Sequence, residues 1–349
     1  MFTPRPAITP RSNKRSGLSG LFLLGLLLAG LPLAVRAQNP QQPAPPPSEN
    51  QQAPPAAPAP GKPYAIQRAV NLVVLHASVV SDRGVFVPGL KEEDFHVFED
   101  KIEQKLSVFR QEDLPVSMGL VIDNSGSMRE KRPEVNAAAL TLVKSSNPQD
   151  EAFVVNFNDD YYLDTVHDFT SNVEEMKDAL ERIDARGSTA LYDAVIGSLD
   201  HLKKGSKDKK VLLVVTDGVD NASRKTLENA VQEAQRSDAV IYTIGLFSDD
   251  DLKHNRNEMK KARRALTELS TATGGVAFFP ENVADTEAIC GQIAHDIRDQ
   301  YTLAYYPTNA AQDGTFRSVF VQVNPQAQRG KMTVRTRTGY YAHKSESGD

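Results

Sequence analysis

Between Pro115 and about Arg298 the sequence alternates short apolar runs with longer amphipathic stretches. The apolar runs predict strands over Val116–Ile122, Ala152–Phe157, Tyr161–Val166, Lys210–Thr216, Val240–Gly245 and Val276–Phe279. The stretches between most of them predict helices over about Pro133–Lys144, Val173–Ile183, Leu191–Lys203, Lys225–Ser237, Glu258–Thr273 and Ala284–Arg298. This alternation predicts an α/β fold, a doubly wound and mostly parallel sheet with helices on both faces.

One predicted strand, Tyr161–Val166, follows Ala152–Phe157 too closely for a helix to fit between them. A crossover between parallel strands needs a dozen or more residues. We therefore expect Tyr161–Val166 to pair antiparallel with its neighbour, at an edge of the sheet.

The first 37 residues have the pattern of a secretory signal peptide. Basic residues precede an apolar stretch, Leu18–Val35, and Ala37 is a small residue suited to a cleavage site. Because Pro32 interrupts the apolar stretch, cleavage is favoured over an uncleaved membrane anchor, which is the alternative. We expect an exported protein, located in the periplasm, in the cell envelope or outside the cell, with no integral membrane segment after cleavage.

The charge of the chain restricts its partners. Removing residues 1–37 takes away five positive charges and no negative one, which changes the formal net charge from -5 to -10. An acidic exported protein is a poor ligand for nucleic acid. The single cysteine, Cys290, cannot form an internal disulfide, and its apolar neighbours Ile289 and Ile293 predict a place in the core.

The segment before the α/β region divides into a linker and a β-rich flank. Residues 38–63 consist mainly of Pro, Gln and Ala and predict a disordered linker. Residues 64–114 contain alternating runs, and two of them, Phe95–Glu99 and Leu106–Phe109, predict a hairpin around the residues between them.

After the α/β region, residues 115–299, the pattern of strands returns over residues 300–342. We expect the two β-rich flanks to pair into one accessory module, followed by a disordered tail over residues 343–349. Five tyrosines of the second flank are predicted to pack in this module, although they could also form a binding strip: Tyr301, Tyr305, Tyr306, Tyr340 and Tyr341.

Asp123, Ser125 and Ser127 lie at alternating positions where the strand Val116–Ile122 ends. Ligands of open α/β sheets bind outside the carboxyl ends of the strands. The three side chains offer only oxygen atoms, which suit Mg²⁺, Ca²⁺ or Mn²⁺ better than zinc or copper. The segment therefore predicts a loop that holds a divalent cation.

Two further loops fit the same prediction. Thr189 offers a hydroxyl at the start of a helix, and Asp217 follows the strand Lys210–Thr216, with Gly218 permitting a turn. Three loops at one edge of a sheet can converge on one ion. Asp193 and Asp220 lie nearby, and a purely local role for Asp193 is favoured, as an acid at a helix N-terminus.

The pattern Asp123-x-Ser125-x-Ser127, with Thr189 and Thr216-Asp217-Gly218, resembles the metal-ion-dependent adhesion site (MIDAS) of von Willebrand factor A (VWA) domains. The stretch from Val116 to about Phe279 is similar to that Rossmann-like domain in length and element order. The flanks, with Val97-Phe98-Glu99-Asp100 and Gln300 to Pro307, resemble exported VWA proteins known mainly from Acidobacteria. With the flanks, the resemblance covers roughly residues 64–342.

The resemblance implies a role for each site residue. Ser125, Ser127 and sometimes Thr189 would bind the ion directly, and Asp123 and Asp217 would act mostly through water or hydrogen bonds. The ion would be Mg²⁺, or Mn²⁺ or Ca²⁺, and a protein partner would present an Asp or Glu to it. The implied function is non-enzymatic binding or adhesion.

Three alternatives stand beside this interpretation. The Asp-x-Ser-x-Ser pattern by itself could be an Asx turn that closes a strand–helix loop. The protein could be an envelope scaffold whose metal site is only structural. A metal-dependent hydrolase is disfavoured because Ser125 stands where dehalogenase-like phosphatases have a second Asp, and because no Gly-x-Ser-x-Gly elbow or His-Glu-x-x-His pattern occurs.

Overall fold

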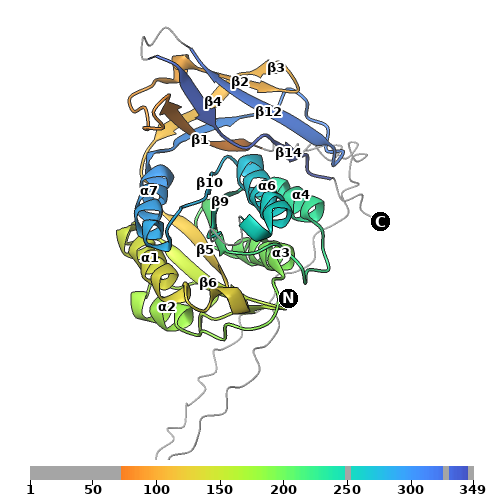
Figure 1. The fold of residues 1–349 in the computed structure, drawn as a ribbon. Helices are drawn as coiled ribbons and strands as arrows, with labels where there is room; N and C mark the ends of the chain where they lie inside the picture. Colours follow the sequence, from red (N-terminus) through yellow and green to blue (C-terminus); the bar gives the residue numbers. More distant parts are fainter. Residues whose placement is uncertain (1–71, 248–252, 325–329, 345–349) are drawn as a thin grey trace, which may run out of the picture. The chain divides into compact units, whose positions relative to one another are not determined.

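The computed structural model describes residues 72–247, 253–324 and 330–344 (Figure 1). The predicted signal peptide, the predicted linker, the end of the predicted tail and the acidic run Asp249–Asp251 lie outside these ranges. Within the described ranges, no helix is long and apolar enough to cross a membrane.

A six-stranded sheet forms the centre of the α/β region, in the order β10-β9-β8-β5-β6-β7. Its strands are β5 (Val116–Asp123), β6 (Glu151–Phe157), β7 (Tyr161–Leu163), β8 (Lys209–Thr216), β9 (Ala239–Gly245) and β10 (Ala277–Phe278). All neighbouring pairs are parallel except β6 and β7, which are antiparallel. The predicted α/β fold and the predicted antiparallel edge strand are both confirmed.

Helices cover both faces of this sheet (Figure 1). The helices on one face are α1 (Arg132–Ser145), α2 (Val173–Leu180) and α7 (Thr286–Asp299). Those on the other face are α3 (Leu191–Leu202), α4 (Leu227–Arg236) and α6 (Arg256–Thr273). The chain runs from β5 to β6 on one side and returns to β8 on the other, so β5 lies at the point where the strand order reverses.

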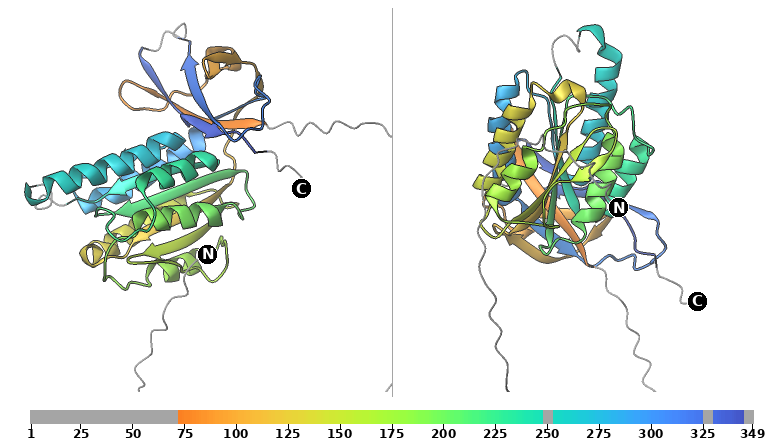
Figure 2. Two further views of the ribbon diagram at one scale, coloured as in Figure 1. Left: turned by 90° about the vertical axis from the view of Figure 1, so that its right-hand side faces the viewer. Right: turned by 90° about the horizontal axis from the view of Figure 1, so that it is seen from below.

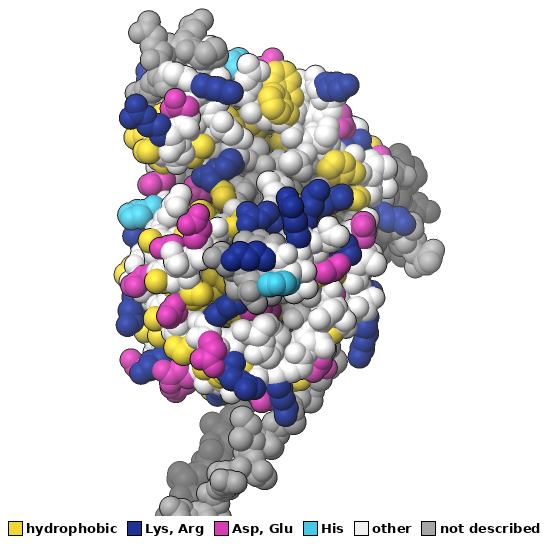
Figure 3. All heavy atoms as spheres, in the orientation of Figure 1, with side chains coloured by type: hydrophobic (Ala, Val, Ile, Leu, Met, Phe, Trp, Pro, Cys, Tyr) yellow, Lys and Arg dark blue, Asp and Glu magenta, His cyan; other side chains and the backbone are white. Residues whose placement is uncertain are grey.

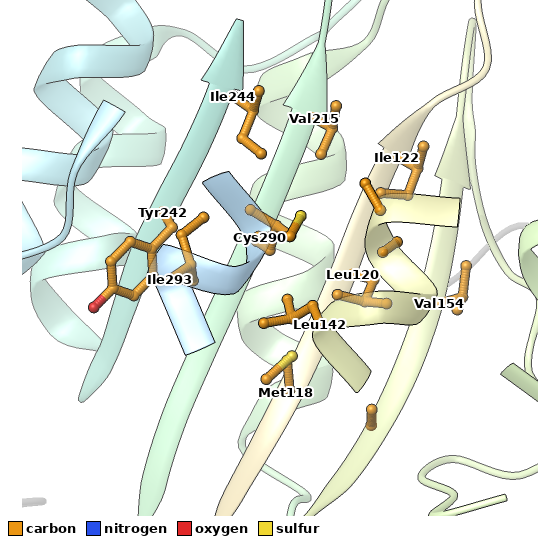
Figure 4. Close-up of a cluster of buried hydrophobic side chains, with 14 of the residues drawn as sticks. Met118, Leu120, Ile122, Leu142, Val154, Val215, Tyr242, Ile244, Cys290 and Ile293 are labelled. Atoms are coloured by element: carbon orange, nitrogen blue, oxygen red, sulfur yellow. The ribbon is translucent and has the colours of Figure 1, made fainter. Parts of the chain in front are cut away.

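Every residue of β5 is buried, because the strand is covered on both faces. Alternate residues of the strand, Met118, Leu120 and Ile122, pack in the cluster that includes Leu142 of α1 and Cys290 of α7 (Figure 4). Burial raises the pKa of the Cys290 thiol to about 12, which disfavours the reactive thiolate. The prediction that this cysteine belongs to the core is confirmed.

The two flanks form a second structure made of two four-stranded sheets, β13-β1-β11-β4 and β14-β12-β2-β3. The strands are β1 (Val73–Ser81), β2 (Phe95–Glu99), β3 (Ile102–Gln104), β4 (Leu106–Gln111), β11 (Tyr301–Tyr305), β12 (Phe316–Val323), β13 (Met332–Arg335) and β14 (Gly339–Tyr341). Strands from before and after the α/β region pair directly, β1 with β11 and β2 with β12. One apolar cluster includes residues of both sheets.

The predicted hairpin between Phe95–Glu99 and Leu106–Phe109 is wrong. Strand β2 pairs instead with β3, through a two-residue turn in which Asp100 and Lys101 both have positive φ, 48° and 69°. Such a turn fits the right-handed twist of paired strands. Strand β4 then leaves this sheet and pairs with β11 in the other one.

The tyrosines of the second flank mostly pack inside this structure. Tyr301 and Tyr305 are fully buried, and their hydroxyls donate to the Val87 carbonyl and the Glu99 carboxylate, at 2.9 and 2.8 Å. Tyr306 is 51% exposed. The interpretation as core residues therefore holds for the first two and not for Tyr306.

Candidate metal centre

The first loop of the site begins at Asp123, the last residue of β5, whose side chain is fully buried. One carboxylate oxygen accepts a hydrogen bond from the Ser125 backbone N–H at 2.8 Å, and the other accepts from the Thr216 hydroxyl at 2.5 Å. The first bond closes an Asx turn, so the local alternative is present in the structure. The second bond reaches the end of β8 and goes beyond any local turn.

Burial raises the pKa of the Asp123 carboxyl to about 6. The hydrogen bonds from Thr216 and Ser125 oppose this shift, and the neighbouring charge of Asp217 adds to it. Near neutral pH the carboxylate is ionised and held by two donors.

The third loop places Asp217 directly after β8 and beside the serines of the first loop. The Ser127 hydroxyl donates to Asp217 Oδ1 at 2.8 Å, and the hydroxyls of Ser125 and Ser127 are 3.3 Å apart. Strands β5 and β8 are hydrogen-bonded neighbours, so their carboxyl ends bring these residues together. The sequence separation between Ser127 and Asp217 is 90 residues.

The second loop joins the other two through its backbone. The N–H of Gly126 donates to the Gly187 carbonyl at 3.4 Å, and the N–H of Asn221 donates to the Thr189 carbonyl at 3.0 Å. The Asn221 side chain accepts in return from the Thr189 N–H at 2.8 Å. A Cβ added at Gly218 would lie 3.4 Å from the Thr189 hydroxyl, so this hydroxyl lies beside the Asp217 loop.

The oxygen atoms that converge here fit a small, hard cation. Ligands about 2.1 Å from an octahedral Mg²⁺ lie roughly 3.0 Å from each other. The separation of 3.3 Å between Ser125 Oγ and Ser127 Oγ is close to that value, and the 2.8 Å between Ser127 Oγ and Asp217 Oδ1 is an ordinary hydrogen bond that orients the hydroxyl. In the described ranges, no group of three or more His, Cys, Asp or Glu could hold a metal, so any cation bound here would depend on hydroxyl oxygens.

Lys131 is a residue of this site that the sequence analysis missed. Its ammonium lies 2.6 Å from Asp217 Oδ2 and also donates to the Leu246 carbonyl at 3.0 Å. The Lys131 side chain is 18% exposed and that of Asp217 only 1% exposed. The signal in the sequence is the spacing, since Lys131 stands four residues after Ser127, about one helical turn away.

Arg132 is a second residue that was missed, and among the described residues it is the largest fully buried side chain. Its guanidinium donates to the Asp123 carbonyl at 3.2 Å, to Asn156 Oδ1 at 2.8 Å and to the Leu180 carbonyl at 2.8 Å. These bonds fix the backbone at the end of β5. A buried arginine is uncommon without such partners. The sequence does not predict this burial, because Arg132 stands close to the exposed residues Arg129 and Glu130.

The two ambiguous acids, Asp193 and Asp220, brace the loops. Asp193 accepts from the backbone N–H groups of Arg224 and Lys225, at 2.9 and 3.0 Å. Asp220 accepts from the Tyr192 N–H at 3.0 Å. Both carboxylates therefore tie the second loop to the third by hydrogen bonds.

Comparison with known proteins gives one family. Residues 118–219 match the model of the von Willebrand factor type A domain. A search of curated proteins gives no match.

Solved structures that resemble this chain include the von Willebrand factor domain of a type V pilus tip protein from Porphyromonas gingivalis. That match has 14% identity and a TM-score of 0.44, and it covers 53% of this chain and 95% of the other. A von Willebrand factor type A protein from Catenulispora acidiphila matches with 13% identity and a TM-score of 0.45, over 73% of this chain and 74% of the other. The minor pilin PilB of Streptococcus sanguinis matches with 14% identity and a TM-score of 0.41, over 54% of this chain and 63% of the other.

Proposed function

Because the chain contains a von Willebrand factor type A domain, we propose that it is a non-enzymatic binding protein whose metal centre receives a carboxylate from a protein partner. The observation that carries the proposal is the convergence of three loops. Ser127 contacts Asp217 at 2.8 Å, and the Thr189 hydroxyl lies beside Gly218.

In this proposal the hydroxyls of Ser125, Ser127 and Thr189 hold the cation, which is Mg²⁺, or alternatively Mn²⁺ or Ca²⁺. A cation so bound would supply positive charge and exchangeable water positions for an incoming Asp or Glu. Asp123 and Asp217 orient the hydroxyls and loops around it. Asp123 accepts from Thr216 and from the Ser125 N–H, and Asp217 accepts from Ser127.

The charges around the site support a partner carboxylate. Asp217 already has the ammonium of Lys131 at 2.6 Å, and Asp123 already accepts two hydrogen bonds. Each carboxylate therefore has less negative charge to offer to a cation than an unpaired one. A cation bound beside these two carboxylates would keep part of its positive charge, so the site favours an additional anionic ligand from a partner.

A binding role is favoured over catalysis by the partners of the two serines. Ser127 donates to a carboxylate that is itself paired with Lys131, and no histidine in the described ranges hydrogen-bonds Ser125 or Ser127. General-base activation of a serine needs a base that can take its proton. Turnover of phosphatase or esterase substrates that disappears in Ser125→Ala would contradict the binding role.

We place the protein outside the cytoplasm, in the periplasm, in the cell envelope or in the medium. The signal-peptide pattern of residues 1–37 and the resemblance of the flanks to exported VWA proteins of Acidobacteria support this location. The N-terminus of the protein isolated from cells can be identified by mass spectrometry. A start at Gln38 is expected, and an intact Met1 would contradict cleavage.

A scaffold with a merely structural metal site is the second candidate. It is favoured by one observation: the Lys131 ammonium neutralises the Asp217 carboxylate, so the loop needs no metal ion to balance that charge. The two candidates differ in whether a partner's binding depends on the metal.

The deciding experiment is capture of partners from the native envelope fraction, in Mg²⁺ and in EDTA. We expect wild-type protein to retain a partner only with Mg²⁺, and Ser127→Ala and Asp217→Ala to retain none. Asp178→Ala is the matched control, because Asp178 is exposed on α2 and lies outside the site. Capture that persists in EDTA, and in both site variants, would favour the scaffold.

A further inference from the structure

The first half of α6 is strongly basic although the chain as a whole has a formal charge of -5. The residues from Lys253 to Arg264 include one acid, Glu258, and a set of cations that we call the basic ridge: Lys253, Arg256, Lys260, Lys261, Arg263 and Arg264. All of them are exposed. Figure 3 shows Lys and Arg side chains gathered over this part of the molecule.

Most of the ridge is not neutralised by neighbours. Lys261 pairs with Glu258 at 2.8 Å, and Arg264 pairs with Glu268 at 3.6 Å. In the described part of the chain, Lys253, Arg256 and Lys260 have no ion pair. Like charges at this spacing repel each other, so the helix bears an electrostatic cost that an anionic partner would relieve.

The ridge rises past the end of the sheet that carries the metal centre. Strand β9 and helix α6 run in opposite directions. Ile241 contacts Thr273, Thr243 contacts Ser270, and the Phe247 ring lies near Arg263. The helix residues before Arg263 therefore lie beyond the carboxyl end of β9. The left view of Figure 2 shows α6 extending beyond the strands on that side.

A short chain of contacts joins the ridge to the metal centre. Asp217 contacts Lys131, and Lys131 donates to the carbonyl of Leu246, the residue before Phe247. The Arg263 guanidinium lies 4.1 Å from the Phe279 ring centroid and 5.9 Å from that of Phe247. Stacking on these rings holds the guanidinium in place, so one cation of the ridge is preorganised against the segment that follows β9.

The ridge continues along one face of α6 as an open surface lined by Lys260, Arg263, Arg264, Thr267, Glu268 and Thr271. The cations of the ridge on α6, from Arg256 to Arg264, extend over about 12 Å of helix, at 1.5 Å per residue. An extended peptide covers that length with about four residues, at roughly 3.3 Å each.

We propose that the basic ridge is a docking surface for an acidic polypeptide segment that flanks the carboxylate bound at the metal centre. The inference rests on the proposed function, and it adds the chemistry of the partner: several Asp or Glu residues near the one that reaches the cation. A narrow, linear set of cations on one helix matches an acidic peptide. An anionic membrane would meet the acidic remainder of the surface and be repelled.

The ridge would act mainly by steering. Exposed charges add little to affinity one by one, but together they raise the rate of association, and salt weakens the effect. We expect binding to weaken strongly between 0.05 and 0.5 M NaCl, because the Debye length falls from about 14 to about 4 Å over that range.

The test uses the full chain and a fluorescein-labelled peptide of ten glutamates, with a ten-glutamine peptide as the neutral probe. In Mg²⁺ we expect the glutamate peptide to bind and the glutamine peptide not to bind. The double variant Lys260→Glu and Arg264→Glu should weaken binding about tenfold or more. The matched control is Lys105→Glu with Lys144→Glu, which changes the net charge equally at exposed positions outside the ridge and should change the affinity less than twofold.

The outcomes separate the two proposals. Loss of binding in the ridge variant but not in EDTA or Asp217→Ala would support the ridge and contradict the metal-bound carboxylate. Loss in EDTA and Asp217→Ala, with the ridge variant equal to the control, would overturn the ridge. Ridge-dependent binding to phosphatidylglycerol vesicles without binding of the glutamate peptide would also overturn it, in favour of a membrane surface.

Discussion

The two ends of the central sheet both bury carboxylates, and they differ in the groups around them: the amino end holds one between a tyrosine and an arginine, and the carboxyl end holds two beside hydroxyl groups. At the amino end, Asp296 of α7 accepts from the Tyr242 hydroxyl and from Arg335, both at 2.7 Å. Gln300 joins the same network by donating to Tyr242 and to Ser78 of β1, at 3.2 and 3.3 Å. The network links the α/β structure to both β1 and β13.

At the carboxyl end, the Ser127 hydroxyl contacts Asp217, the Ser125 hydroxyl lies 3.3 Å from that of Ser127, and the Thr189 hydroxyl lies beside Gly218. A hydroxyl has one proton and two lone pairs. Because Ser127 donates to Asp217 and can accept from Ser125, one of its lone pairs remains. The difference teaches that a buried carboxylate serves cohesion where donors from neighbouring elements pair with it, as at Asp296, even though Gln300 Oε1 and Arg335 Nε have no partner among the described residues. Hydroxyl groups with free lone pairs, as at the carboxyl end, are suited to binding.

The largest effect is expected at the amino end of the sheet, which we call the closed end because its buried carboxylate, Asp296, is paired with protein groups. Asp296→Ala would leave Arg335 and the Tyr242 hydroxyl without their carboxylate, in a place where the Asp296 side chain is only 10% exposed. Loss of one partner of a buried pair costs about 3 kcal/mol. We expect the free energy of unfolding in urea to fall by about that amount, with the metal-dependent stabilisation retained. A loss below about 1 kcal/mol would show that this end is not the cohesive one.

The next effect is expected at the carboxyl end of the sheet, which carries the candidate metal centre and which we call the open end. If the site binds Mg²⁺, a concentration of 100 times Kd should stabilise the wild type by about 2.7 kcal/mol, because only the folded chain gathers the three loops. Thermal unfolding of Ser127→Ala and Asp217→Ala should show no such shift, and Asp178→Ala should shift like the wild type. Equal shifts in all four proteins would place the metal elsewhere.

The closed end should also be sensitive to acid. Burial, together with the charges of Lys209 and Arg337, lowers the pKa of His76 from 6.5 to about 3. The unfolded chain therefore binds a proton at this residue between pH 6.5 and 3 when the folded chain does not. Stability from this group is present above pH 6.5 and falls as the pH drops toward 3, by up to about 1.4 kcal/mol per pH unit. Denaturation in urea at several pH values should show a smaller slope in His76→Gln, and an unchanged slope would refute the assignment.

The smallest effect is expected from Lys131, whose ammonium would compete with a cation for Asp217. Lys131→Met removes a like charge next to the metal centre and should strengthen Mn²⁺ binding about tenfold, or about 1.4 kcal/mol. Titration followed by electron paramagnetic resonance gives the affinity directly, and Lys144→Met controls for net charge. Weaker binding in Lys131→Met would mean that the lysine organises the site instead of opposing the ion.

Much of the α/β structure could be predicted from local patterns. Each predicted strand and helix of that region has its counterpart, and the ends differ by a few residues at most: the helix predicted over Pro133–Lys144 is α1, Arg132–Ser145. The short spacing before Tyr161 forced an antiparallel pair, as found in β7. These features depend on residues close together in the chain.

The flanks were harder because their pairing is not local. The runs Phe95–Glu99 and Leu106–Phe109 alternate equally well, and nothing within them says that β2 and β4 belong to different sheets. The positive φ values of Asp100 and Lys101 make the tight turn that diverts the chain. Non-glycine residues rarely adopt positive φ angles, so the sequence does not predict this turn.

By itself the sequence determined the α/β alternation and the identity of the oxygen-bearing residues in each loop, because periodicity and strand-end motifs act over a few residues. The tertiary structure alone decided that Thr216 reaches Asp123 across 93 residues and that Lys131 reaches Asp217 across 86. It also placed the basic ridge of α6 beyond the carboxyl end of β9. The physical reason is that hydrogen bonds and charge pairs require contact in space, and only the neighbouring strands β5, β8 and β9 create that contact.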